Sequence, residues 1–301
     1  MAREQTGICA EPNLHGVFLL FNGLEGKERQ LKQQLGKLTP LIDVLAEQFS
    51  EAMLNSVIGI GPVLWPRLNQ SVTPEYLSWA ELGETEAELP SFHYDLLVHL
   101  RADRFDVLYI ALSQVMQLLN QQAELVEQWF CFRYLDGREL TGFYDTPDNP
   151  RGRAKRVAAL VDSTGHPFNG GSYLLLLKQH CELHRWQQLT SEQQQTLMGR
   201  YKTSGQLLPS AQREADSMAE RAALEPQGER LKLLWQNMPC ADAKQQGMVA
   251  LGCSAEPADL LQYLDKRFGV QNGYDRMLDY CPIEQGALFF APSLNMLEKW
   301  G

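Results

Sequence analysis

Two kinds of hydrophobic spacing alternate in the first 134 residues, and their order limits the folds open to the chain. Short apolar runs with the length and aromatic content of buried strands lie at about 16–22, 55–60, 94–100 and 128–134. Two longer segments, at about 27–49 and 105–122, space apolar residues three and four positions apart, which is typical of amphipathic helices. The order strand–helix–strand–strand–helix–strand predicts a ferredoxin-like unit.

The second half of the chain presents the same kinds of element with longer connections. Strands are expected at 171–177, 248–253 and 286–291, and a helix at 257–268. The two halves share no obvious sequence repeat, so the duplication is inferred from element order alone. We expect an α+β protein of two tandem ferredoxin-like domains, residues 1–138 and 139–301.

Charge and composition exclude several classes of protein. A hydrophobic content of 44% and a charged content of 21% fit a soluble globular protein, and the net charge of -10 argues against binding to nucleic acids or anionic membranes. The six cysteines are scattered with no C-x-x-C pair, which favours reduced thiols over disulfides or a zinc site. Neither a signal peptide nor an apolar run of roughly 18 residues is visible. We therefore expect a cytoplasmic protein with no membrane or nucleic-acid partner.

The clearest motif lies beside the expected domain boundary. Residues 140–150 read LTGFYDTPDNP, which matches the pattern G-F-x-D-G-x-x-N-P from Gly142 and Phe143 through Asp145 to Pro150, with Thr146 in place of the second glycine. The stretch resembles the signature loop of the dye-decolourising (DyP-type) haem peroxidases. Segments at 170–173, 199–202, 237–239 and 289–293 follow in family order. The whole chain thus resembles a cytosolic bacterial P-type-like member of that family.

The resemblance implies haem b, held mainly by the C-terminal domain, and a peroxidase mechanism that depends on three side chains. A proximal histidine would ligate the iron, a distal aspartate would move a proton between the peroxide oxygens, and a distal arginine would stabilise the charge of the breaking O–O bond. Asp145 matches the distal aspartate, Asn237 matches a small polar distal position, and Gly142 and Phe143 fall beside the cofactor. From the residues alone, the Asp145 loop also has the composition of a simple turn former.

Two of the three side chains are replaced in this chain. The proximal pattern S-H-x-x-R reads SMAER at 217–221, so Met218 stands at the histidine position, and the last histidine of the chain is His184. The distal pattern V-R-x-S/N-x-P reads LWQNMP at 234–239, so Trp235 stands at the arginine position. A thioether is a weak haem-iron ligand that raises the reduction potential, and an indole carries one N–H donor and no charge. Arg221 keeps its place and could pair with a haem propionate or with a neighbouring acid.

We therefore expect a peroxidase-fold pseudoenzyme whose activity is lost or strongly impaired, without haem, and which assembles as a homo-oligomer or with an active relative. Met218 would then fill a gap and Trp235 would be a core aromatic, and the good helix formers of 211–224 predict a helix there. Two alternatives stay open: a haem-binding or sensing protein with Met218 or solvent on the iron, and a non-standard peroxidase in which Asp145 acts alone. If the pocket survives, Met218→His with Trp235→Arg should restore activity.

Overall fold

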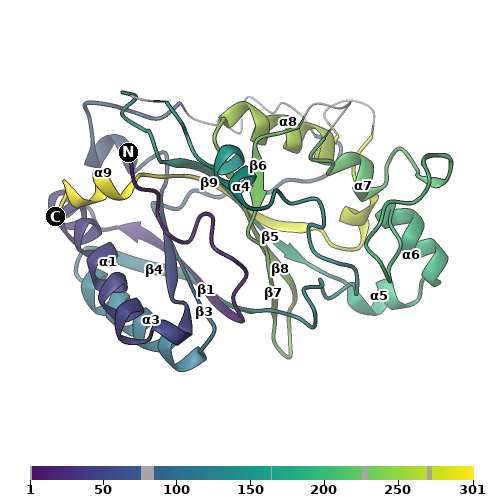
Figure 1. Ribbon diagram of the computed structural model, residues 1–301, viewed down its shortest axis with the longest axis horizontal. Coiled ribbons are helices and arrows are strands. Elements are labelled where there is room, and N and C mark those ends of the chain that lie inside the picture. The colour runs from purple at the N-terminus through teal and green to yellow at the C-terminus, as the bar shows by residue number, and fades with distance from the viewer. Residues whose placement is uncertain (1, 76–84, 164, 226–229, 270–272) are drawn as a thin grey trace.

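The strands of the chain form one antiparallel sheet, in a computed structural model that describes residues 2–75, 85–163, 165–225, 230–269 and 273–301. The strand order is β4 (Ala123–Phe132), β1 (His15–Gly23), β3 (Leu96–Ala102), β2 (Asn55–Ile60), β9 (Ile283–Ala291), β5 (Ser172–His180), β8 (Gln246–Ser254) and β6 (Leu233–Trp235) (Figure 1). A further strand, β7 (Met238–Ala241), pairs with the free part of β8. The first four strands come from the N-terminal half of the chain and the others from the C-terminal half. A single residue pair, Ile60 with Phe290, links β2 to β9 and joins the two halves.

The N-terminal half has the expected ferredoxin-like order of elements. They are β1 (His15–Gly23), α1 (Glu28–Gln48), η1 (Ser50–Ala52), β2 (Asn55–Ile60), α2 (Trp65–Leu68), β3 (Leu96–Ala102), α3 (Phe105–Leu119) and β4 (Ala123–Phe132). Strand β4 begins five residues before the predicted start. It is an edge strand in which Glu124 is exposed and the burial alternates, so its first half lacks the apolar run that marks the inner strands.

The C-terminal half repeats the same strand order with a longer insertion. Its strands and second helix are β5 (Ser172–His180), β6 (Leu233–Trp235), β7 (Met238–Ala241), β8 (Gln246–Ser254), α8 (Pro257–Phe268) and β9 (Ile283–Ala291). The other helices are short. Within the described residues, four of them lie between β5 and β6, where the N-terminal half has its first long helix: α5 (Leu183–Gln187), α6 (Ser191–Met198), η3 (Ser210–Gln212) and α7 (Met218–Arg221). Before β5 comes α4 (Arg153–Ala159), before β9 comes η5 (Arg276–Asp279), and after β9 comes α9 (Leu294–Glu298). The α+β class with two ferredoxin-like units is confirmed, and the boundary at 138/139 stays a prediction.

Both faces of the inner strands are buried, which explains their continuous apolar sequences. On β1, Val17 and Leu19 belong to the core beneath the helices, whereas Phe18 belongs to a second core that also contains Leu174 of β5. The sheet faces that carry no helix therefore pack against each other, and α1 and α3 cover the N-terminal strands on their other face (Figure 1). Within the described residues, no helix combines the length and apolar character needed to cross a bilayer.

Candidate functional site

The signature loop follows β4 and is fixed to the C-terminal half by Phe143. This side chain is fully buried, and its ring lies 6.1 Å from that of Trp186 in an edge-on contact. Gly142 before it has φ = +88°, and a Cβ at this position would lie 2.7 Å from Cε of Lys202. The left-handed backbone favours glycine here, and the end of the flexible Lys202 side chain uses the space that a Cβ would take. Gly142 and Phe143 thus shape the loop that carries Asp145.

Thr146 retains the backbone turn for which the family pattern has glycine. Its φ is +38°, in the left-handed region that disfavours a β-branched residue. Its hydroxyl accepts a hydrogen bond from Nδ2 of Asn149 at 3.2 Å, which partly offsets the strain. The loop therefore keeps its shape despite the substitution.

Replacement of Thr146 by glycine is expected to raise the free energy of unfolding by up to about 1 kcal/mol, because relief of the left-handed strain exceeds the entropy that glycine adds to the unfolded chain. Urea denaturation of Thr146→Gly beside the wild-type protein measures this difference. Thr141→Gly is a control in the same loop without a positive φ, and it should lower stability. A loss of stability in Thr146→Gly would mean that the hydroxyl contact outweighs the strain.

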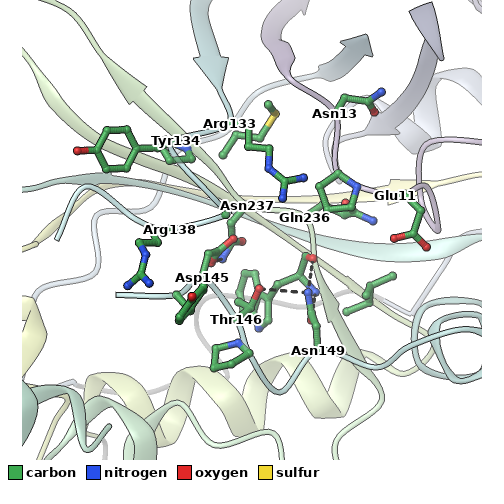
Figure 2. Close-up of a pocket in the computed structure, with 18 of the residues that line it drawn as sticks. Glu11, Asn13, Arg133, Tyr134, Arg138, Asp145, Thr146, Asn149, Gln236 and Asn237 are labelled. Atoms are coloured by element: carbon green, nitrogen blue, oxygen red, sulfur yellow. Dashed lines mark hydrogen bonds between the residues drawn. The ribbon is translucent and has the colours of Figure 1, made fainter. Parts of the chain in front are cut away.

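Asp145 and Asn237 lie together in space, 92 positions apart in the sequence. Nδ2 of Asn237 donates to Oδ1 of Asp145 at 2.8 Å, and Figure 2 shows the two side chains side by side. Burial raises the pKa of the Asp145 carboxyl to about 6, against the opposing effect of hydrogen bonds from Asn237 and Thr146. A carboxyl with that pKa exchanges protons readily near neutral pH.

Trp235 fills the space beside this pair. Asn149 holds its backbone with two hydrogen bonds, one from the Trp235 amide at 2.9 Å and one to the Trp235 carbonyl at 2.8 Å. The indole is buried, and its ring lies 4.9 Å from that of Tyr263 on α8. A Cβ on Gly252 of β8 would come within 3.0 Å of the indole ring, so glycine provides room for it. The indole thus occupies the space between β8 and α8.

Met218 lies in a hydrophobic cluster. It is the first residue of α7 and packs against the cluster that contains Phe143, Trp186, Met198 and Met277. Arg221 ends the same helix, with Nη2 3.2 Å from the position of a Cβ on Gly273.

The prediction of a helix over 211–224 was wrong, because only a short 3-10 turn and the four residues of α7 are helical. The carbonyl of Asp216 accepts a hydrogen bond from the backbone amide of Arg276 at 3.0 Å, a tertiary contact that competes with helix formation. Propensity alone therefore overestimated the helix.

The cavity between Met218 and Trp235 has a volume of only about 60 Å³. Its other lining residues include Glu139, Met248 and Tyr263. Pockets that bind cofactors typically measure roughly 300–1,000 Å³. The residues present therefore do not fit haem, since the space is filled and no imidazole is available from the last third of the chain. Among the described residues, no group of three His, Cys, Asp or Glu side chains could hold a metal ion.

Two buried ionisable groups at this cavity were missed by the sequence reasoning. Glu139 is 8% exposed, and burial together with the negative charge of Asp145 raises its pKa to about 8. Arg267 pairs through Nε with Oδ2 of Asp275 at 3.2 Å and donates to the Tyr263 hydroxyl at 3.0 Å. The helical spacing from Leu260 through Tyr263 places Arg267 on the apolar face of α8, a signal that could have revealed it.

A second, larger cavity of about 450 Å³ lies on the other side of Trp235. Trp235, Asn237, Tyr144, Thr146 and Pro147 line both cavities and form the wall between them. Asp145 faces the larger cavity only (Figure 2). The structure thus places Asp145 and Asn237 at the larger cavity, Met218 at the small one, and Trp235 between them.

Comparison with known sequences defines the class of the protein. The profile "Dyp-type peroxidase, N-terminal" matches residues 5–133, and "Dyp-type peroxidase, C-terminal" matches residues 136–296. A dye-decolorizing peroxidase from Rhodococcus erythropolis is 29% identical over 288 residues, which cover 94% of this chain and 84% of the relative. One from Brevibacterium linens is 28% identical over 97% of this chain and 81% of its own.

Solved structures extend the likeness to the whole fold. A putative DyP-type peroxidase from Shewanella oneidensis matches with a TM-score of 0.94 and 33% identity over 99% of each chain. The encapsulated DyP-type peroxidase of Mycobacterium smegmatis matches with a TM-score of 0.93 and 27% identity over 99% of this chain and 98% of its own. A DypB variant from Rhodococcus jostii in complex with heme matches with a TM-score of 0.90 and 25% identity over 100% of both chains. The chain belongs to the DyP-type peroxidase family.

Proposed function

We propose that this chain is a DyP-type family member that binds no haem and has lost peroxidase activity. The observation that carries the proposal is the cavity of about 60 Å³ between Met218 and Trp235. A relative in this family has a structure in complex with heme. A chain without space for the macrocycle differs from that relative at the cofactor site. The protein would then act through binding or assembly.

The chemistry of the replaced side chains supports the same conclusion. Peroxide cleavage needs an electron-rich proximal ligand and a cation beside the breaking O–O bond. Met218 offers a neutral thioether that already packs against aromatic and sulfur side chains, and Trp235 offers no charge. Asp145 retains a pKa of about 6 that suits proton transfer, but without the other two groups this acid has no reaction to assist.

The alternatives have weaker support. A haem-sensing protein with Met218 on the iron would require the indole of Trp235 to leave its contact with Tyr263 and its place over Gly252. A non-standard peroxidase would keep the hydrogen-bonded pair of Asp145 and Asn237, which speaks in its favour. It would also need a proximal ligand, and no histidine follows His184 in the sequence.

A double variant tests whether the enzyme is merely disarmed or its pocket has closed. Histidine and methionine are similar in size, and arginine is only somewhat smaller than tryptophan, so Met218→His with Trp235→Arg opens little space. We expect this variant, supplied with hemin, to show no peroxide-dependent dye oxidation above that of free hemin. A turnover comparable with that of an active relative assayed in parallel would mean that the pocket is intact and the proposal is wrong.

We further propose that the protein is cytoplasmic and assembles, with itself or with an active relative. All six cysteines are free in the structure, which suits a reducing compartment. The relative from Mycobacterium smegmatis is described as encapsulated, so at least one member of the family works inside an assembly. Light scattering should give a molar mass of at least twice 34.1 kDa, either for the protein alone or after addition of an active relative. A monomeric mass in the presence and absence of an active relative would contradict the assembly proposal.

A further inference from the structure

The larger cavity has the size of a metabolite-binding site. Its volume of about 450 Å³ falls within the range of small-molecule pockets, roughly 300–1,000 Å³. Most of its lining comes from four segments of the chain, 10–13, 132–138, 144–151 and 234–239, and Arg101, Lys155 and Ser204 complete it. Because Trp235 separates it from the small cavity, its use does not depend on whether haem binds beside Met218.

The lining of this cavity is positively charged, although the whole chain carries a net charge of -10. The cationic side chains of the lining are Arg101, Arg133, Arg138, Arg151 and Lys155, and the acidic ones are Glu11 and Asp145. Lys155 pairs with Glu11, and Arg138 pairs with Asp136. The remaining three arginines have no carboxylate partner among the described residues. A pocket with this balance attracts anions.

Arg101 is a buried cation beneath the cavity. It is 2% exposed and donates hydrogen bonds to Oε1 of Gln236 and to the carbonyl of Gly7, both at 2.5 Å. Its Nε finds no acceptor within the described part of the chain. Burial without a counter-charge lowers the pKa of Arg101 to about 10, so the side chain stays charged and leaves a positive potential under the site.

Arg133 is an exposed cation in the lining of the cavity. It follows the end of β4, and in Figure 2 its side chain extends toward Asn237 and Gln236. Nη2 lies 3.5 Å from the position of a Cβ on Gly137, an ordinary van der Waals distance, so the guanidinium rests beside this turn. No side chain or carbonyl within the described residues accepts a hydrogen bond from this guanidinium. A planar guanidinium with free donors suits a carboxylate, which it can hold with two parallel hydrogen bonds.

The lining of the cavity also offers uncharged hydrogen-bonding groups and aromatic faces. Oδ1 of Asn237 is buried with no donor within the described residues, and its Nδ2 is used by Asp145. A buried acceptor without a donor favours a ligand that carries a hydroxyl group. Trp235 and Tyr144 add aromatic surface to the same lining, on which the carbon skeleton of such a ligand can pack.

We propose that this cavity binds a small hydroxylated carboxylate of the size of a sugar acid, with its carboxylate on Arg133 and a hydroxyl group on Asn237. The assignment rests on the volume of the cavity, the unpaired cations and the unsatisfied amide oxygen. Such a ligand would have no part in haem binding or peroxide chemistry. The site is distinct from any site at Met218 and can be tested separately.

The test is isothermal titration of the purified wild-type protein with three probes: gluconate, glucose and hexanoate. Gluconate carries the carboxylate and the hydroxyl groups, glucose lacks the charge, and hexanoate lacks the hydroxyl groups. We expect gluconate to bind with a dissociation constant of ~1 mM or below, and each of the other two at least about tenfold more weakly. The absence of saturable gluconate binding, or equal binding of glucose, would overturn the proposal.

A pair of arginine variants locates the site. Arg133→Gln removes an exposed charge that lines the cavity, and Arg153→Gln removes an exposed charge nearby that does not line it. We expect the first to weaken gluconate binding at least about tenfold and the second to leave it within twofold, about the limit set by screened surface charges. Equal effects of the two variants would mean that gluconate responds to the general surface potential, and the cavity would not be its site.

Discussion

Replacement of Trp235 by alanine is expected to lower the free energy of unfolding by about 3–5 kcal/mol, as for other buried tryptophans. The indole is 5% exposed and packs between Tyr263 and Gly252, so its removal leaves a space that these neighbours cannot close. Urea denaturation followed by circular dichroism measures the loss, because the signal does not depend on the missing indole. Trp235→Phe is the conservative partner and should lose less than half as much.

The same variant has a second readout that follows from the position of the indole. Trp235 belongs to the wall between the cavities of about 60 Å³ and about 450 Å³, so Trp235→Ala should join them into one space. A joined space should bind an apolar fluorescent probe that the wild-type protein and Trp235→Phe do not bind. A loss below 1 kcal/mol with no gain in probe binding would mean that the indole does not fill this space.

Replacement of Glu139 by glutamine is expected to make the protein more stable at slightly alkaline pH. The carboxyl is buried beside Asp145, and its pKa rises from an ordinary 4.5 to about 8 in the folded protein. An acid with a raised folded pKa contributes its full stability below the unfolded pKa and loses it as the pH rises toward the folded pKa. The window of loss therefore runs from about pH 4.5 to about pH 8.

The size of the effect follows from proton linkage. Within that window one such group lowers the free energy of unfolding by up to about 1.4 kcal/mol per pH unit. Between pH 5.5 and 7.5 the wild-type protein should thus lose up to about 3 kcal/mol relative to Glu139→Gln. Urea denaturation of both proteins across this range gives the difference, in which the contributions of other groups largely cancel. Parallel stability–pH curves for the two proteins would contradict the raised pKa.

Asp145→Asn is the matched control for this pH series. The Asp145 carboxyl of the wild-type protein has a folded pKa of about 6, so the stability that depends on this carboxyl is lost at lower pH, between about pH 3.8 and pH 6. The two variants should therefore separate from the wild-type protein over different pH ranges. The same range for both would mean that the two carboxyls titrate as one coupled pair.

The sequence predicted the fold well where hydrophobic spacing is strong. The strand around Phe18 and the helix with Leu31 and Leu35 on its buried face were found within one or two residues of their ends. Spacing failed on β4, whose first half is an exposed edge. Helix propensity failed at 211–224, where a tertiary hydrogen bond to Asp216 replaces the helical one. Local patterns cannot report either effect, because each depends on which segment lies alongside.

From the sequence, the site could be predicted only as a list of the residues that belong to it. The motif placed Asp145 and Asn237 together and pointed to Met218 and Trp235 as departures, but volumes lie outside a one-dimensional pattern. The volumes of the two cavities depend on how the indole packs over Gly252. The raised pKa of Glu139 likewise follows from burial, and the sequence around Glu139 gives no sign of that burial.

Titration of the purified wild-type protein with hemin, followed by absorbance and then desalting, tests the central claim most directly. An active relative treated in the same way serves as the positive control. A cavity of about 60 Å³ cannot admit the macrocycle, so we expect no Soret band beyond that of free hemin and none after desalting. A band that saturates at one haem per chain and survives desalting would contradict the account and would make Met218 a candidate for the iron ligand.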